Sequence, residues 1–242
     1  MNTNIIETHN LTKGTGKNTR VNHIDLHIPE GCVYGFLGPN GAGKTTTLKL
    51  LLGLLKPTDG SIYFFGHQMT EKNRLAILKQ TGSLIENPSF YGHLTGLENL
   101  QIVAKMKNVP ASEIKKVLEM VRLYEHKDKK VKHYSLGMKQ RLGIAMALLG
   151  KPRVLILDEP TNGLDPAGIQ EMREFIKSLP VTHQMTVIVS SHLLSEMEQM
   201  VDMVGIINHG NLIYQGTINN LEKHGNNLED IFLKLTGGNE SL

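Results

Sequence analysis

Residues 38–45 read Gly38-Pro39-Asn40-Gly41-Ala42-Gly43-Lys44-Thr45 and match the phosphate-binding loop pattern G-x-x-x-x-G-K-[ST] at every fixed position. The glycines permit backbone conformations that a side chain would forbid, so successive N–H groups can turn toward phosphate oxygens. Lys44 adds a positive charge for the β- and γ-phosphates, and Thr45 offers its hydroxyl to Mg²⁺. The sequence therefore predicts a nucleoside triphosphate site formed by Gly38 through Thr46.

Apolar segments on both sides place this loop between a strand and a helix. Cys32 to Leu37 is a short apolar run typical of a buried strand, and Thr46 to Leu55 has the apolar density of a helix ending before Lys56-Pro57. In that order, the positive end of the helix dipole faces the bound phosphates. The alternative, a chance glycine-rich turn, does not explain these flanks.

Composition indicates a globular chain. It has 242 residues, 40% hydrophobic content and a net charge of +3, which is too thinly spread to indicate nucleic-acid binding. Its one cysteine, Cys32, lies in the predicted strand as a small buried side chain, and no disulfide can form within the chain. We expect neither a secretory leader at Met1 to Asn10 nor a membrane-spanning segment.

A second segment, Val154 to Glu159, is an apolar strand that ends in two adjacent carboxylates. Ligands collect at the carboxyl ends of parallel strands, so this strand can deliver both acids beside the phosphate-binding loop. We expect Asp158 to hold Mg²⁺ and Glu159 to polarise the water that attacks the γ-phosphate. The alternative is a solvated strand end.

The segment Tyr134-Ser135-Leu136-Gly137-Met138-Lys139-Gln140-Arg141 opens a predicted helix with Ser135 as its N-cap. A small residue at Gly137 would let an anion approach the exposed N–H groups, giving a second phosphate site. The segment resembles the Leu-Ser-Gly-Gly-Gln signature of ABC-type ATPases, in which serine and glycine contact the γ-phosphate held by a partner subunit. Leu136 and Met138 depart from that pattern, so the resemblance carries over Ser135 and Gly137.

Further ABC motifs follow in the family's order. Asn162-Gly163-Leu164-Asp165 resembles the D-loop, with Asp165 as its acid, and His192 follows a predicted strand, Met185 to Ser190, where the family has its switch histidine. A lone histidine after a strand is more often structural. The resemblance, however, implies that His192 senses the γ-phosphate.

One departure falls after the predicted strand Thr81 to Ile85, where Glu86 stands in place of the family's usual glutamine. A carboxylate can offer an oxygen to Mg²⁺ or water, but it donates no hydrogen bond. This resembles the glutamate-containing loop of lantibiotic self-protection exporters, and Ser-Leu-Gly-Met-Lys-Gln-Arg resembles the bacitracin-resistance group. We expect a catalytic and metal-binding role for Glu86; a neutral replacement is the alternative.

At the expected adenine site, Thr15 occupies the position of the family's aromatic residue, and no Tyr, Phe or Trp precedes Tyr34. A stacking contribution of roughly 1–3 kcal/mol would then be missing, so we expect GTP to bind nearly as well as ATP.

The middle of the chain predicts helices inserted into the sheet. Thr95 to Glu98 is a capping-box pattern opening a helix to about Asn108, and Ser112 to Tyr124 repeats apolar residues at helical spacing. The resemblance implies that the loop from Glu86 to Leu97 contacts a membrane permease, with Pro88, Phe90 and Tyr91 as exposed candidates. The basic run Lys127 to His133 is assigned no ligand.

Toward the C-terminus, the sequence predicts a helix and then a hairpin with Asn208-His209-Gly210-Asn211 as its turn. Met197, Met200 and Met203 are expected to fill the core rather than bind a metal. The tail from Leu228 to Thr236 resembles the ending of exporter ATPases.

Together these features predict an α/β P-loop NTPase of ABC type with an N-terminal antiparallel β portion and an inserted helical subdomain. The expected single domain spans 1–242: an ATP-binding core at 1–86 and 150–217, the helical subdomain at 87–149 and a tail at 218–242. The resemblance implies an ATPase subunit of an exporter, which uses ATP and Mg²⁺ and couples dimer closure to export of an antimicrobial peptide of the lantibiotic or bacitracin type in self-protection or resistance. It also implies a homodimer with separate permease subunits at the cytoplasmic face of the membrane, and no binding of nucleic acid. Alternatives are an exporter ATPase for another drug or lipid, a soluble ABC ATPase acting as a binding switch, and a P-loop kinase.

Overall fold

Residues 4–14, 19–86 and 89–222 are described by the computed structural model of this chain. The predictions for Thr15, Pro88 and the segment 228–236 lie outside these residues. An antiparallel sheet near the N-terminus has the strand order β2-β1-β5-β6, and β3 also pairs with β1. Its strands are β1 (Asn4–Lys13), β2 (Val21–Ile24), β3 (His27–Pro29), β5 (Asp59–Phe64) and β6 (His67–Gln68).

The second sheet is mixed and has the order β11-β10-β4-β9-β8-β7, in which only β11 runs antiparallel to its neighbour. Every residue of β4, β8 and β9 is buried, as expected for parallel strands covered on both faces. The strands are β4 (Val33–Leu37), β7 (Thr81–Leu84), β8 (Val154–Asp158), β9 (Thr186–Ser191), β10 (Met203–Asn208) and β11 (Asn211–Thr217).

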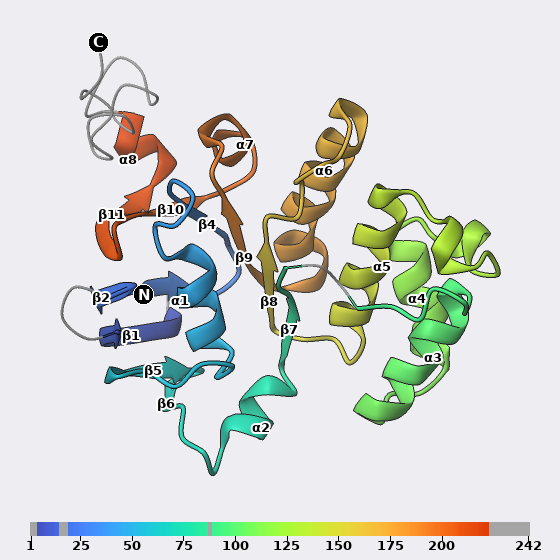
Figure 1. The fold of residues 1–242 in the computed structure, drawn as a ribbon, viewed down its shortest axis with the longest axis horizontal. Coiled ribbons are helices and arrows are strands. Elements are labelled where there is room, and N and C mark those ends of the chain that lie inside the picture. The colour runs from blue at the N-terminus through green and yellow to red at the C-terminus, as the bar shows by residue number, and fades with distance from the viewer. Residues whose placement is uncertain (1–3, 15–18, 87–88, 223–242) are drawn as a thin grey trace.

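Helix α1 (Lys44–Leu51) packs between the two sheets, where Leu48 and Leu51 share a hydrophobic core with Ile6, Tyr34 and Ile188 (Figure 1). The helix is shorter than the predicted Thr46 to Leu55. Gly53 follows the C-cap with φ 61°, the left-handed conformation that ends many helices. A short helix, α2 (Arg74–Leu78), precedes β7.

The inserted helices α3 (Gly96–Lys107), α4 (Ser112–Met120) and α5 (Leu136–Leu148) lie beyond the far side of the mixed sheet from α1 (Figure 1). The capping box of Thr95 and Glu98 is confirmed. Helix α4 ends earlier than predicted because Arg122 is left-handed, with φ 56°. Two 3₁₀ turns, η2 (Tyr124–His126) and η3 (Val131–His133), lead to α5. Phe90 is half-buried against this core, so the prediction that it is exposed was wrong, whereas Tyr91 is exposed.

The remaining helices are α6 (Pro166–His183), α7 (Leu194–Glu198) and α8 (Ile218–Glu222). The predicted hairpin is confirmed: β10 and β11 are joined by His209 and Gly210, both with positive φ. Met197 and Met200 are buried in the core, as predicted, and Met203 is half-buried against it. In the described part of the chain, no helix is long and apolar enough to cross a membrane.

Candidate functional site

The predicted phosphate-binding loop joins β4 to α1, and two of its glycines are required by close packing. Gly43 has φ 114°, and a Cβ there would lie 2.5 Å from the carbonyl oxygen of Arg20. A Cβ at Gly38 would lie 2.3 Å from the carbonyl oxygen of Ile207. Both contacts are shorter than atoms tolerate, so any side chain would force the loop out of place.

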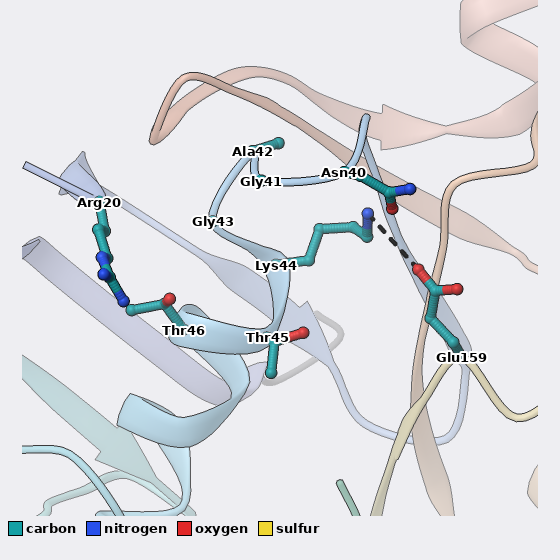
Figure 2. Close-up of a pocket in the computed structure, with 9 residues that line it drawn as sticks. All are labelled: Arg20, Asn40, Gly41, Ala42, Gly43, Lys44, Thr45, Thr46 and Glu159. Carbon is teal, nitrogen blue, oxygen red and sulfur yellow. Dashed lines mark ion pairs between the residues drawn. The ribbon is translucent and has the colours of Figure 1, made fainter. Parts of the chain in front are cut away.

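The loop borders an open cleft of about 250 Å³. Its lining residues are Arg20, Asn40, Gly41, Ala42, Gly43, Lys44, Thr45, Thr46 and Glu159 (Figure 2). Lys44 is buried and its Nζ donates to the carbonyl oxygens of Gly38, at 2.6 Å, and Pro39, at 3.2 Å. Burial lowers the pKa of Lys44, while the nearby carboxylates of Glu159 and Asp158 oppose that change. The lysine is thus held beside its own loop and two acids.

Asp158, the last residue of β8, is buried and accepts two hydrogen bonds. Thr45 Oγ1 donates to its Oδ2 at 2.9 Å, and Ser190 Oγ donates to its Oδ1 at 2.5 Å. A hydroxyl and a carboxylate side by side are hard oxygen donors of the kind that Mg²⁺ takes, with phosphates and water supplying its other ligands. Within the described residues, no cluster of three His, Cys, Asp or Glu side chains could hold a metal alone. The site therefore fits a cation shared with a nucleotide.

Glu159 follows Asp158 with φ 48°, a strained conformation for a side-chain-bearing residue. Its N–H donates to Ser190 Oγ at 2.9 Å. Its carboxylate lies between two nitrogens: Oε1 is 3.7 Å from Lys44 Nζ, and Oε2 is 2.9 Å from Nδ1 of His192. A carboxylate fixed in this way at the edge of the cleft can accept a proton from a water molecule that attacks a bound phosphate.

A model of the ABC transporter family matches residues 21–162. The chain belongs to the ABC transporter family. It is 50% identical over 220 residues to the bacitracin transport ATP-binding protein BcrA of Enterococcus faecalis, covering 90% of this chain and 71% of that protein. It is 44% identical to the lantibiotic transport ATP-binding protein SrtF of Streptococcus pyogenes, covering 94% and 96%.

Among solved structures, an ATP-binding subunit of an ABC transporter superposes with a TM-score of 0.83 at 27% identity, covering 96% of this chain and 99% of that one. The predicted fold class, an ABC-type P-loop NTPase with an antiparallel β portion and inserted helices, is thereby confirmed. The chain is an ATP-binding subunit of an ABC transporter and, like the subunits of this family, an ATPase.

In this ABC ATPase, the predicted signature residues do not line the cleft of the phosphate-binding loop. Ser135 caps α5, its Oγ accepting the N–H of Met138 at 3.2 Å, as predicted. A Cβ on Gly137 would meet only Leu164, at 3.6 Å, so one side of this residue is open. Asp165 caps α6 by accepting the N–H of Gly168 at 3.0 Å. Ser135 and Gly137 are therefore available to a ligand outside the cleft.

Glu86 also lies away from the cleft lining. It has φ 58°, and its exposed carboxylate accepts a 2.6 Å hydrogen bond from Lys49 of α1. Lys49 lies one helical turn beyond Thr45, so the pair sits farther along α1 than the expected cation site. The catalytic and metal-binding role of Glu86 stays a prediction.

Sequence reasoning missed two residues of this site, Arg20 and Ser190. Arg20 lines the cleft across the loop from Glu159, with its side chain directed toward Thr46 (Figure 2). No motif marks Arg20, because its place depends on the pairing of β1 and β2. Ser190 is the residue that touches both acids, and its position before His192 was the available signal.

Proposed function

We propose that this chain hydrolyses ATP to drive export of an antimicrobial peptide of the bacitracin or lantibiotic type, in self-protection or resistance. The observation that carries the proposal is similarity across nearly the whole chain to a protein named for lantibiotic transport, together with 50% identity to one named for bacitracin transport. The loop, lysine and carboxylate that line the cleft support this proposal.

In the proposed reaction, the loop N–H groups and Lys44 hold the β- and γ-phosphates. Thr45 and Asp158 would hold Mg²⁺, which neutralises phosphate charge when bound. Glu159 accepts the proton of the attacking water, and its contact with His192 keeps the carboxylate pointed at the cleft. In this proposal, His192 also donates a hydrogen bond to a γ-phosphate oxygen.

The partner in the reaction is a second copy of this chain. Ser135 and Gly137 lie outside the cleft of their own chain, yet the helix N-terminus that they form suits a phosphate. Two copies arranged head to tail would place these residues of each on the nucleotide of the other, with Asp165 at the interface. Closure and reopening of this sandwich would move separate permease subunits in the membrane. For that coupling, the chain would bind the permease at the cytoplasmic face of the membrane.

Gel filtration of Glu159→Gln with and without ATP and Mg²⁺ tests the sandwich. The variant should bind ATP, fail to hydrolyse it and shift to a dimer, while Lys44→Ala, which cannot hold the phosphates, should stay a monomer. A Glu159→Gln variant that binds ATP and remains monomeric would contradict the sandwich and favour kinase-like chemistry.

Growth of the native host on bacitracin and a lantibiotic panel tests the cargo. A strain lacking the chain should be sensitised to at least one peptide, and the intact chain should restore resistance whereas Glu159→Gln at equal expression should not. Unchanged growth of the deletion strain on every peptide would remove the peptide assignment and leave an exporter ATPase for another drug or lipid.

A further inference from the structure

Glu196, in α7, is a buried carboxylate that does not line the cleft. Its side chain has two hydroxyl partners that meet at one oxygen: Thr161 Oγ1 donates to Oε2 at 2.7 Å, and Ser191 Oγ donates to the same atom at 3.2 Å. Moving a carboxylate out of water costs free energy unless hydrogen bonds replace its hydration. These two bonds explain how Glu196 is tolerated, and its two partners indicate what it does.

The partners of Glu196 belong to the two segments that carry the proposed hydrolytic groups. Thr161 is two residues after Glu159, and Ser191 immediately precedes His192. The hydroxyl of Ser191 also accepts the N–H of Leu193 at 3.0 Å, so its own proton is directed to Glu196.

These contacts form a closed ring. The backbone connects Glu159 to Thr161, and the Thr161 hydroxyl donates a hydrogen bond to Glu196. Glu196 also accepts a hydrogen bond from Ser191, which precedes His192 in the chain. Nδ1 of His192 lies 2.9 Å from Oε2 of Glu159 and completes the ring. Within this ring, a shift of either segment changes the distance between His192 and Glu159.

We propose that Glu196 is a positioning residue for ATP hydrolysis, which fixes the loop after β8 against the loop after β9 and thereby holds His192 on Glu159. The inference rests on the proposed roles of Glu159 and His192. The segment from Asn162 to Asp165 follows Thr161 directly, so a second copy docking on that segment would act on His192 through Glu196.

Two variants of Glu196 separate positioning from simple core packing. Glu196→Gln keeps an oxygen that can accept both hydroxyls, whereas Glu196→Met keeps the volume and removes the acceptor. Because the phosphate-binding loop is untouched, the Kd for ATP, measured with a fluorescent analogue, should stay within about twofold in both. The kcat of Glu196→Met should fall roughly 10- to 100-fold, a part of the factor that a well-placed base supplies, and Glu196→Gln should retain most of it.

Lys107→Met is the structural control. Lys107 is exposed, and its Nζ donates to the carbonyl oxygens of Met146, Ala147 and Leu149, far along the chain from the ring. Its loss should lower the melting temperature while leaving kcat per folded molecule unchanged. If Glu196→Met does not fold, Thr161→Val and Ser191→Ala each remove one hydroxyl of the same ring, and their effects on kcat should be non-additive in the double variant.

Three results would overturn the proposal: an unchanged kcat in Glu196→Met, a kcat in Glu196→Gln as low as in Glu196→Met, or a loss of kcat that only follows the loss of folded protein, as in Lys107→Met. Glu159→Gln distinguishes this failure from failure of the proposed function. If Glu159→Gln is inactive while Glu196→Met is fully active, Glu196 has no positioning role. If Glu159→Gln still hydrolyses ATP, the assignment of the base falls and the role of Glu196 falls with it.

Discussion

Replacing Ser190 with alanine should both destabilise the protein and loosen the two acids of the site. Ser190 is fully buried. Its hydroxyl donates a hydrogen bond to Oδ1 of Asp158 at 2.5 Å and accepts one from the backbone N–H of Glu159 at 2.9 Å. A hydrogen bond to a charged group contributes about 1.5–3 kcal/mol, and a buried N–H left without a partner costs about 1–3 kcal/mol. Because part of each loss is recovered by relaxation, we expect Ser190→Ala to lower the free energy of unfolding by about 3 kcal/mol.

Thermal unfolding without nucleotide measures this effect directly. For a chain of this size, roughly 2–4 °C is lost per kcal/mol, so the melting temperature should fall by about 6–12 °C. Ser178→Ala is the matched control: Ser178 is half-buried in α6 and donates to the carbonyl oxygen of Phe175 at 2.7 Å, one turn back in the same helix. Its loss should change stability by no more than about 0.5 kcal/mol.

A second measurement links Ser190 to function. With its carboxylate no longer fixed by Ser190, Asp158 should hold Mg²⁺ less well, and hydrolysis by Ser190→Ala should need a higher Mg²⁺ concentration than hydrolysis by Ser178→Ala. Equal melting temperatures for the two variants would refute the view that these bonds stabilise the site. A large drop in melting temperature with unchanged Mg²⁺ dependence would show that Ser190 stabilises the fold without placing Asp158.

Three further expectations follow from other side chains. Arg20→Ala should weaken ATP and GTP binding alike by up to about fivefold, because an exposed pair of opposite charges contributes about 0–1 kcal/mol. A competition titration that shows a strong preference for ATP would contradict the expected loose base selectivity. Lys49→Met should leave the melting temperature nearly unchanged, because exposed ion pairs contribute about 0–1 kcal/mol. The variant should hydrolyse ATP at a lower Mg²⁺ concentration, because Glu86 no longer binds Lys49. An unchanged Mg²⁺ titration would argue against a metal role for Glu86. Burial raises the pKa of Cys32 to about 12, so the thiol of the native protein should resist alkylation at pH 8, and rapid labelling would contradict this. The free energy of unfolding should fall as the pH rises from about 9 toward 12, because in that range the unfolded chain releases a thiol proton that the native state retains.

Local signals in the sequence were enough for much of the fold. The caps at Thr95 and Ser135 each depend on residues within three positions, and both are confirmed. The ends of helices are harder to predict from the sequence. Helices α1 and α4 end near Gly53 and Arg122, which adopt left-handed φ, and the spacing of apolar residues does not indicate such a conformation. Gly53 was a readable stop signal, whereas nothing in its residue type marks Arg122 for that conformation.

The contacts that the sequence did not predict join segments that lie far apart in the chain. Glu86 has Lys49 as its partner, 37 residues away, and Glu196 reaches Thr161 over 35 residues. Each of these residues has the ordinary chemistry of its type, and only the sheet order brings the partners together. Motifs therefore predicted which groups react, whereas the residues that hold those groups in place could be located only in the structure.

The assembly of the site follows from one feature of the mixed sheet: β9 lies between β4 and β8, although it comes last of the three in the chain. The three strands are parallel, so the residues after them emerge at the same edge. Gly38 follows β4, Glu159 follows β8 and His192 follows β9. Ser190 pairs in register with Asp158 on one side and Phe36 on the other, which puts its hydroxyl beside the acids. A sheet in which β8 lay between β4 and β9 would contain the same motifs, but Ser190 would no longer lie between the strand that leads into the phosphate-binding loop and the strand that ends in the two acids.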